Sequence, residues 1–442
     1  MSNFSLDTAA AVRRIRARNS VLNAFLATRL DEALVDAERL AREPPRSALH
    51  GVPFGLKDEW DTAGFPTTGG SYRHRHRVPE RDHAVFEVFD AAGAVLVGKT
   101  NLSDMGLAPE ASSYVGGSVR NPRDPTRTAG GSSGGGAAAV ADAMAGFDWG
   151  TDIGGSIRLP AAFCGIFGMR LSSETWPIRD LFPKIPEPLA WLCGQGPFTT
   201  TLAQMRDVLD VAAPRLRSGG ASTFEVRGAV LYAPAKPGRW PSFREDARNP
   251  IEAAIGFDVE PESGLPGTTS VRNRYSAIWS SHFEELFAAD PTIGLREGTR
   301  AVLSAVVLRG AFGDKRFHPT SAELLALIAL GRATIFRDRA RALKGAAAVR
   351  DAFRRIWDRG RIVVAPVCAY PAPRVGRMNR NPHILSCTVP GNIADATALS
   401  VPFGAFDDGL PRALQLMGPP GSEDALLELA TRLVAVQVPS AR

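Results

Sequence analysis

The sequence predicts an α/β fold built around a largely buried β-sheet. Short apolar runs typical of buried strands alternate with amphipathic helical segments. Hydrophobic residues make up 44% of the chain and charged residues 22%, which is an ordinary globular balance. At 442 residues the chain suits one large domain or two ordinary ones. No internal repeat or low-complexity linker marks a domain boundary.

The first half of the chain supplies a helix, a second helix and a strand. Apolar residues between Leu22 and Leu40 fall on one helical face, and Pro44-Pro45 ends this predicted helix. Residues 85–92 predict a helix that ends at Gly93. The apolar run at 94–97 then predicts a buried strand.

Later segments continue the alternation. Residues 137–144 are small and apolar, as expected of a helix packed closely against a sheet. Thr320 with Glu323 forms a capping-box pattern that opens a long helical stretch towards Asp358, with a break expected near Gly345. The last two elements are a buried strand and a closing helix, at 362–364 and 423–436.

Bulk properties exclude several functional classes. The formal charge is +6, but basic and acidic residues are interspersed, so we expect no nucleic-acid partner. No apolar stretch approaches the ~20 residues of a membrane span. The first fourteen residues lack a secretory-signal pattern, so the expected location is cytoplasmic. Four widely spaced cysteines predict reduced thiols, with no disulfide scaffold and no zinc site.

Three glycine-rich segments carry the candidate chemistry, at 51–58, 130–136 and 150–158. Glycine lets a substrate approach the backbone closely. None of the three contains the Gly-Lys-Ser/Thr of a phosphate loop, and the bare match at 93–100 has a strand as its spacer. An α/β-hydrolase elbow fits around Ser133, but no clear apolar strand precedes it.

Taken in order, these segments resemble the amidase signature family, and the resemblance covers nearly the whole chain. The matching blocks are Gly-Val-Pro-x-x-x-Lys-Asp from Gly51, Gly-Lys-Thr-Asn from Gly98, Gly-Gly-Ser-Ser-Gly-Gly from Gly130, Gly-Thr-Asp-Ile-Gly-Gly-Ser-Ile-Arg from Gly150, and Gln-Leu-x-Gly from Gln415. The resemblance implies one compact domain with a large, mixed, mostly buried sheet and helices on both faces. Its expected parts are a catalytic core at about 50–215, a variable substrate-side region at about 216–355 and a closing core segment at about 356–442.

The resemblance also assigns roles residue by residue. Ser156 matches the nucleophile, Ser132 the bridging serine, which the family holds in a cis peptide, and Lys57 the base. The backbone N–H groups that match the family's oxyanion hole are those of Ile153, Gly154, Gly155 and Ser156.

Three further polar residues are expected to support this site. Ser133 holds its loop or hydrogen-bonds Lys57, while Asp152 and Arg158 pair to brace the turn. No metal or organic cofactor is implied.

The chemistry of such a site can be stated without the family. A serine hydroxyl is a weak nucleophile and needs a base beside it. A lysine can be that base only as a neutral amine, so we expect Lys57 to be buried with no carboxylate bound to its ammonium. Each oxyanion donor is typically worth ~3–4 kcal/mol of transition-state stabilisation.

Two departures from the family pattern leave substrate specificity open. Gly-Met-Arg-Leu-Ser at 168–172 replaces the usual Gly-Leu-Lys-Pro-Thr, and Cys193 stands where many members carry an aspartate. Both are expected near the substrate pocket. The segment from Trp176 to Trp191, rich in aromatic residues and prolines, either lines an apolar acyl pocket or forms a surface strap.

The leading functional hypothesis is hydrolysis of a small-molecule carboxylic amide to an acid and an amine or ammonia, through an acyl-Ser156 intermediate. One alternative transfers the acyl group to an amine and forms a new amide. Another makes the chain the glutaminase-like component of a glutamine-dependent tRNA amidotransferase, which works with partner subunits. A non-catalytic binding scaffold is disfavoured because all three matched positions are intact. A homodimer remains open.

Overall fold

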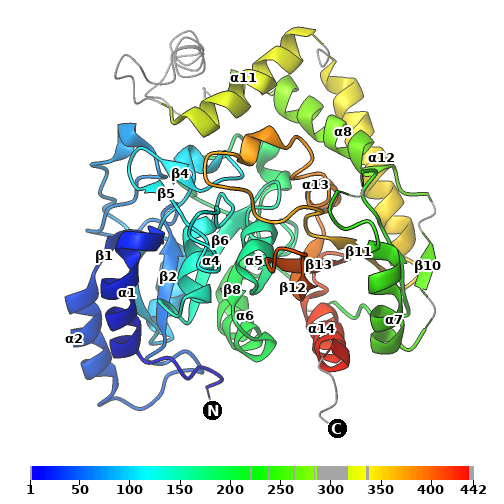
Figure 1. The fold of residues 1–442 in the computed structure, drawn as a ribbon. Coiled ribbons are helices and arrows are strands. Elements are labelled where there is room, and N and C mark those ends of the chain that lie inside the picture. Colours follow the sequence, from blue (N-terminus) through cyan, green and yellow to red (C-terminus); the bar gives the residue numbers. More distant parts are fainter. Residues whose placement is uncertain are drawn as a thin grey trace.

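Figure 1 shows the fold as a computed structural model, which describes residues 2–219, 222–236, 238–257, 259–261, 264–282, 284–285, 317–334 and 338–437. Within these residues eleven strands form one large sheet. Its strands are β1 (Phe25–Thr28), β2 (Pro53–Lys57), β3 (Val95–Thr100), β6 (Phe147–Asp152), β7 (Phe167–Arg170), β8 (Gly194–Thr199), β9 (Gly228–Leu231), β10 (Val259–Pro261), β11 (Arg361–Pro366), β12 (Thr397–Ala405) and β13 (Pro411–Gly418). Two short strands, β4 (Ser112–Ser113) and β5 (Gly117–Ser118), form a separate hairpin.

The large sheet is mixed, with the order β1-β3-β2-β6-β8-β7-β12-β13-β11-β9-β10. The neighbours β3, β2 and β6 run parallel, and so do β11, β9 and β10. The pairs between β6 and β11 are antiparallel. Because β2 and β6 are parallel neighbours, their carboxyl ends lie at the same edge of the sheet, where α/β proteins place their sites.

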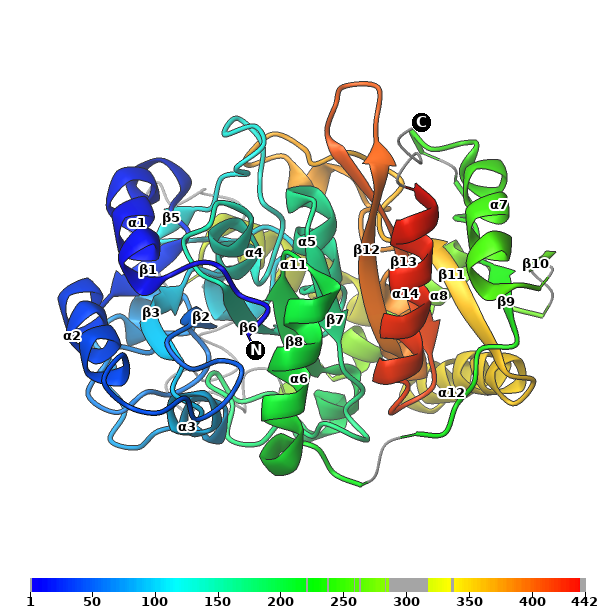
Figure 2. The same cartoon turned by 90° about the horizontal axis from the view of Figure 1, so that it is seen from below.

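Helices cover both faces of the sheet. The α-helices of the described residues are α1 (Thr8–Leu22), α2 (Leu30–Leu40), α3 (Ala84–Ala91), α4 (Gly134–Ala141), α5 (Arg158–Cys164), α6 (Leu202–Leu216), α7 (Phe243–Ile255), α8 (Thr268–Ser281), α11 (Pro319–Thr334), α12 (Arg339–Trp357), α13 (Val389–Ala394) and α14 (Glu423–Gln437). Four short 3-10 turns join them, η1 (Tyr72–His74), η2 (Asp104–Gly106), η3 (Glu187–Leu192) and η4 (Met378–Arg380). One face packs against α3, α6, α7 and α14, and the other against α4, α5 and α12, while α8 lies against α11, α12 and α13 (Figure 2).

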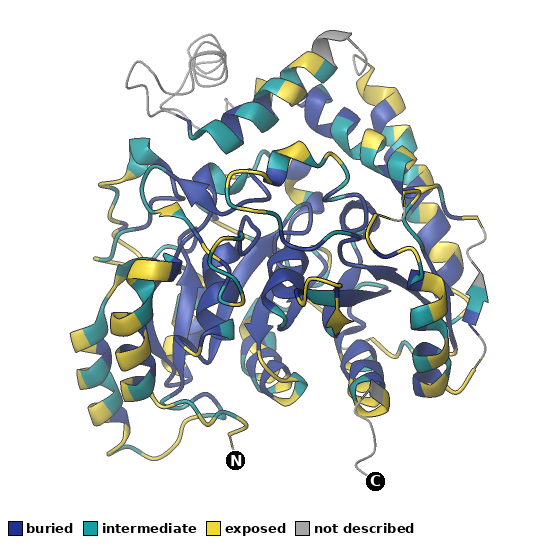
Figure 3. Cartoon of the chain, viewed as in Figure 1, coloured by how far each residue is buried: buried dark blue, intermediate teal, exposed yellow. Residues whose placement is uncertain are grey.

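The strands form the buried centre of the molecule, and the outer helices expose one side each (Figure 3). Aromatic rings dominate one part of this core, where Phe54 of β2 stacks on Phe147 of β6 with ring centroids 5.2 Å apart. On the opposite face α4 consists of glycine, alanine and one valine, and it lies fully buried up to Val140. Side chains this small let the helix approach β2, β6 and β8 closely.

The architecture confirms the predicted α/β class, the mixed and mostly buried sheet, and the single compact domain. The predicted strand at 94–97 lies in β3 and that at 362–364 in β11, while α3 and α14 match the helices predicted at 85–92 and 423–436. The helix predicted at 137–144 begins earlier, at Gly134, and ends at Ala141.

Two helix predictions were wrong. The segment from Leu22 to Leu40 contains strand β1, because Asn23 adopts a left-handed conformation that ends α1, and the next residues pair with β3. Tertiary strand pairing here overrides a helical apolar pattern. The break expected near Gly345 is not there, because Gly345 is inside α12, which begins at Arg339 after the extended N-cap residue Asp338.

None of the helices in the described ranges is long and apolar enough to cross a membrane. All four cysteines are buried free thiols. Burial raises the pKa of the Cys164 thiol to about 12, so this residue is a packed core thiol at neutral pH.

Asp148 on β6 should make stability depend on pH. Burial raises the pKa of its carboxyl to about 7, although the Thr100 hydroxyl and the charge of Lys57 act in the opposite direction. The unfolded value is near 3.9, so ionisation weakens the fold as pH rises through this interval. As the pH rises from about 4 to about 9, the free energy of unfolding of Asp148→Asn should increase by ~2–4 kcal/mol relative to that of the wild type. Urea denaturation at several pH values measures this, and a difference that does not change with pH would contradict it.

Candidate active site

The three glycine-rich segments meet at the carboxyl ends of β2 and β6. Lys57 is the last residue of β2, and Asp152 is the last residue of β6. Ser132 lies two residues before α4, and Ser156 lies two residues before α5. All four are buried or nearly so. The fold thus places residues from distant parts of the sequence at one edge of the sheet.

Lys57 and Ser132 are in direct contact. The Lys57 Nζ donates a hydrogen bond of 2.8 Å to Ser132 Oγ. The peptide between Gly131 and Ser132 is cis, as the resemblance implied. The backbone of this loop is tied to η2, since the Ser103 N–H donates to the Ser132 carbonyl oxygen at 3.3 Å.

Ser156 lies beside the Ser132–Ser133 loop, and backbone contacts join the two. The Ser133 N–H donates to the Ser156 carbonyl oxygen at 3.3 Å, and Ser133 Oγ donates to the Thr151 carbonyl oxygen at 3.1 Å. Ser133 therefore holds the loop. Among the described residues the Ser156 hydroxyl has no hydrogen-bond partner, so the expected link from Ser132 to Ser156 is not made in this conformation. Ser156 keeps 8% of its surface exposed.

The surroundings of Lys57 differ from the expectation of an amine without a carboxylate. Glu59 Oε2 lies 3.0 Å from Lys57 Nζ, with the side chains 5% and 0% exposed. Thr151 joins the pair, because its Oγ1 accepts from Lys57 at 2.7 Å and donates to Glu59 Oε2 at 2.8 Å. The expectation was wrong because the chain turns directly after β2, where the Glu59 N–H donates to the Lys57 carbonyl oxygen at 2.7 Å. This turn folds the glutamate back onto the lysine.

Sequence reasoning missed both Glu59 and Thr151. Glu59 gave one signal, as the third of three consecutive charged residues that begin at the last residue of a strand. Thr151 gave no signal of its own, because it lies between Gly150 and Asp152 in a motif whose expected roles fell on other residues.

The turn after β6 carries the amides that were matched to an oxyanion hole. One of them is already used, since the Gly155 N–H donates to Asp152 Oδ1 at 2.8 Å. In the described part of the chain the amides of Ile153, Gly154 and Ser156 donate to no other group. The arrangement therefore leaves three of the four matched N–H groups available to a ligand.

Partners from the second half of the chain fix the carbonyl groups of this turn. The Tyr275 hydroxyl of α8 donates to the Ile153 carbonyl oxygen at 2.9 Å, and Thr388 Oγ1 donates to that of Gly154 at 2.6 Å. Gly155 has φ +123°, and a Cβ there would lie 2.5 Å from Thr388 Oγ1. Only glycine fits at this position.

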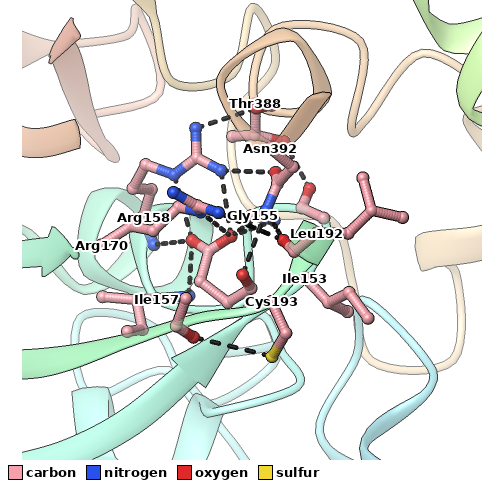
Figure 4. Close-up of polar contacts among 12 residues, drawn as sticks. Ile153, Gly155, Ile157, Arg158, Arg170, Leu192, Cys193, Thr388 and Asn392 are labelled. Atoms are coloured by element: carbon pink, nitrogen blue, oxygen red, sulfur yellow. Dashed lines mark hydrogen bonds and ion pairs between the residues drawn. The ribbon is translucent and has the colours of Figure 1, made fainter. Parts of the chain in front are cut away.

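A buried ion pair braces the same turn (Figure 4). Arg158 Nε and Nη2 donate to the two carboxylate oxygens of Asp152 at 3.0 and 2.9 Å, as the sequence predicted for this pair. Asn392 donates to Asp152 and accepts from Arg158. Burial alone would raise the pKa of the Asp152 carboxyl, but Arg158, Arg170 and Asn392 hold it below its ordinary value. Asp152 is therefore a charged structural anchor and not a proton donor.

A pocket with an empty volume of about 760 Å³, partly open to solvent, adjoins this site through Glu59, Thr151 and Ile153. Most of its lining is apolar and comes from Met105, Leu107, Leu181, Trp279, Phe317 and Leu325. Arg73 and Lys184 add positive charge. The lining residues between Leu181 and Pro186 show that part of the proline-rich segment forms a pocket wall, whereas Trp176 is buried in the core.

No group of three or more His, Cys, Asp or Glu side chains in the described residues could hold a metal ion.

Comparison with known proteins decides the family. The sequence model of the amidase family matches residues 8–223 and 266–427. The chain belongs to the amidase signature family. It is 31% identical to the A component of the glutamyl-tRNA(Gln) amidotransferase of Symbiobacterium thermophilum, a match that covers 95% of this chain and 91% of that protein. It is also 31% identical to AmiB2 of Mycobacterium tuberculosis, which is named as an amidase, over 96% of this chain and 90% of that protein.

Solved structures agree in fold. The peptide amidase of Stenotrophomonas maltophilia has a TM-score of 0.74 at 24% identity, covering 97% of this chain and 92% of that one. A structure described as an amidase has a TM-score of 0.73 at 26% identity, covering 97% of this chain and 95% of that one. Membership of the amidase signature family makes this chain an amidohydrolase of the type that acts on linear amide C–N bonds.

The two departures from the amidase signature pattern have different consequences. Cys193 does line the pocket. The segment at 168–172 does not, because Arg170 is buried and donates to Asp395 at 2.9 Å, and Ser172 donates to the same carboxylate at 2.8 Å. Its expected role in the pocket was wrong, because these side chains face a structural anchor on the carboxyl side of α13.

Arg158→Met should destabilise the fold strongly, because it leaves the Asp152 carboxylate buried without its main partner. We expect a loss of ~3–5 kcal/mol in the free energy of unfolding, measured by urea denaturation. Arg206→Met is the matched control, since the ion pair of Arg206 with Asp424 is exposed and should contribute at most about 1 kcal/mol. Equal losses in the two variants would contradict a bracing role for Arg158.

Proposed function

We propose that this enzyme hydrolyses a carboxylic amide through an acyl-serine intermediate, with Ser156 as nucleophile, Ser132 as proton relay and Lys57 as base. The observation that carries the proposal is the 2.8 Å hydrogen bond from Lys57 Nζ to Ser132 Oγ, inside a buried site that adjoins Ser156. A lysine hydrogen-bonded to one serine beside a second serine has the layout of a nucleophile that is activated through a relay.

The proposed steps conserve protons throughout. The Ser156 hydroxyl attacks the amide carbon while its proton passes to Ser132, and the Ser132 proton passes to the neutral Lys57 amine. The resulting oxyanion accepts hydrogen bonds from the free amides of the turn after β6. The relay then runs backwards and protonates the leaving nitrogen, so the C–N bond breaks and acyl-Ser156 remains. Water attacks this ester through the same relay and releases the acid.

The proposed relay needs a further contact, between Ser132 and Ser156. The Ser132 Oγ contacts Lys57 but not Ser156 in this conformation, and catalytic hydrogen bonds often tighten only in the substrate complex. The two serine loops are already joined by the Ser133–Ser156 backbone contact. We expect substrate binding to bring the Ser156 hydroxyl into contact with Ser132 Oγ.

The pocket supports a substrate with an apolar group. Its lining is mainly apolar with a few polar and charged groups, which is typical of small-molecule sites. Its apolar walls, formed by η2, the segment 181–186, α8 and α11, favour an uncharged aliphatic or aromatic substituent over the charged end of an amino acid.

The relatives named as amidotransferase components support a second candidate function, the glutaminase-like component of a glutamine-dependent amidotransferase. Such a component releases ammonia from glutamine and works with partner subunits. The mainly apolar pocket offers fewer partners for the charged end of glutamine than for an apolar group, so we place simple amide hydrolysis first.

Labelling with a fluorophosphonate probe tests the nucleophile without a known substrate. We expect the wild type to be labelled at Ser156, Ser156→Ala to lose all labelling, and Lys57→Ala and Ser132→Ala to be slower by at least ~100-fold because the relay is cut. Mass spectrometry of the labelled peptide identifies the modified residue. Arg206→Ala, far from the site on the protein surface, is the control that should keep wild-type labelling. Label on a residue other than Ser156, or none on folded wild type, would refute the proposal.

A series of primary amides tests the pocket. We expect kcat/KM to rise from acetamide to amides with larger aliphatic or phenyl groups, and to stay low for glutamine. Leu325→Asn should lower kcat/KM by about tenfold for large apolar amides and little for acetamide, because Leu325 is 2% exposed and lines the pocket. Leu327→Asn on the same helix is the control, since Leu327 is 63% exposed. A preference for glutamine would favour the amidotransferase function instead.

A further inference from the structure

Lys57 is surrounded by charged and titratable groups on several elements. Glu59 reaches it from the turn after β2, at 3.0 Å. Asp148 on β6 and Cys193, directly before β8, lie close enough for the charge of Lys57 to lower the pKa of each. Burial is the larger effect on both, and it raises the pKa of Asp148 to about 7 and that of Cys193 to about 12. Glu59 is therefore the one carboxylate in direct contact with the amine, among the described residues.

The remaining ionic neighbours are occupied elsewhere. Asp58 precedes Glu59 in the chain, but its Oδ1 lies 3.6 Å from Lys99 Nζ, and its Oδ2 accepts from Thr68. Asp152 is held by Arg158. Neither of these carboxylates therefore competes with Glu59 for contact with the Lys57 amine.

The position of the Glu59 carboxylate is fixed from two sides. Thr151 Oγ1 donates to its Oε2, so lysine, threonine and glutamate form a closed ring of contacts. On the other side, a Cβ added at Gly106 would overlap Glu59 Oε1, so the backbone of η2 leaves just enough room for the carboxylate. A group confined in this way holds its partner at a fixed place.

A carboxylate at this distance has a predictable effect on a buried amine. Burial favours the neutral form of a lysine, whereas an opposite charge in contact favours the protonated form. The proposed base works only as a neutral amine, so the carboxylate opposes the reaction at low pH. At the same time it keeps the amine directed towards Ser132.

We propose that Glu59 is a positioning residue for the base: it orients the Lys57 amine towards Ser132 and sets the pH above which the relay becomes active. This inference rests on the proposed function, in which Lys57 receives the proton. Glu59 takes no part in the proton steps written above.

Cys193 offers a way to separate charge from geometry. It lines the same pocket as Glu59, and the charge of Glu59 contributes to the raised pKa of its thiol, after burial. A carboxylate placed there would face Lys57 from the β8 side, without contact through the turn after β2.

The test is the rate of fluorophosphonate labelling of Ser156 as a function of pH. We expect the wild-type rate to rise with pH, and Glu59→Gln to move the midpoint down by about 1–3 pH units, because the ammonium loses its counter-charge. The double variant Glu59→Gln/Cys193→Asp should move the midpoint back up. Circular dichroism and thermal unfolding confirm that each variant is folded. If Glu59→Gln does not fold, Glu59→Asp takes its place and should shift the midpoint in the same direction by less.

The outcomes distinguish this inference from the proposed function. A labelled wild type whose midpoint is unchanged in the folded Glu59 variant would overturn the inference alone. A double variant that stays at the midpoint of Glu59→Gln would also overturn it, because the shift would then come from the lost contact with Thr151 and not from charge. A folded wild type that the probe never labels would refute the proposed function, and the inference with it.

Discussion

The buried pair of Asp152 and Arg158 is the interaction on which the site depends. Both side chains are fully buried, and each satisfies its remaining hydrogen-bonding capacity within the protein. Asp152 fixes the amides on the inside of the turn, and Arg158 connects the turn to Thr388, Asn392 and Gln415 in the last quarter of the chain. A buried ion pair contributes little to the net free energy of folding, but it holds the turn in a single geometry. Ser156 and the free amides of the turn take their positions from it.

Several parts of this structure could be predicted from the sequence because local patterns and motifs agreed. Apolar runs such as 94–97 and 362–364 are strands because they are too short for helices and are bounded by turn residues. The pairing of Asp152 with Arg158 could be predicted because the two residues flank a glycine turn that brings them together. Strand β1 could not, because its residues fit a helical face equally well, and only pairing with β3 selects the extended form.

The site shows the same division. Motif spacing identified the Lys57–Ser132 contact, but it carried no information on the direction of a side chain two residues beyond a strand end. Glu59 is in contact with Lys57 because of a turn whose geometry depends on the neighbouring strand β6 and on η2. The use of the Gly155 amide by Asp152 was likewise invisible, since a backbone N–H can face either a ligand or a carboxylate in the same motif. Contacts from distant segments, such as those of Tyr275 and Thr388, left no local signal.

The hydroxyl of Tyr275 gives the substrate-side helix a second role. Tyr275 holds the carbonyl of Ile153, and one helical turn further along α8, Trp279 forms part of the pocket wall. A substituent that packs against the tryptophan therefore contacts the helix that also anchors the turn after β6. Binding energy from the apolar part of a substrate can therefore raise kcat as well as substrate affinity. Substrates that differ only in their remote apolar portion would then be discriminated by their turnover rate.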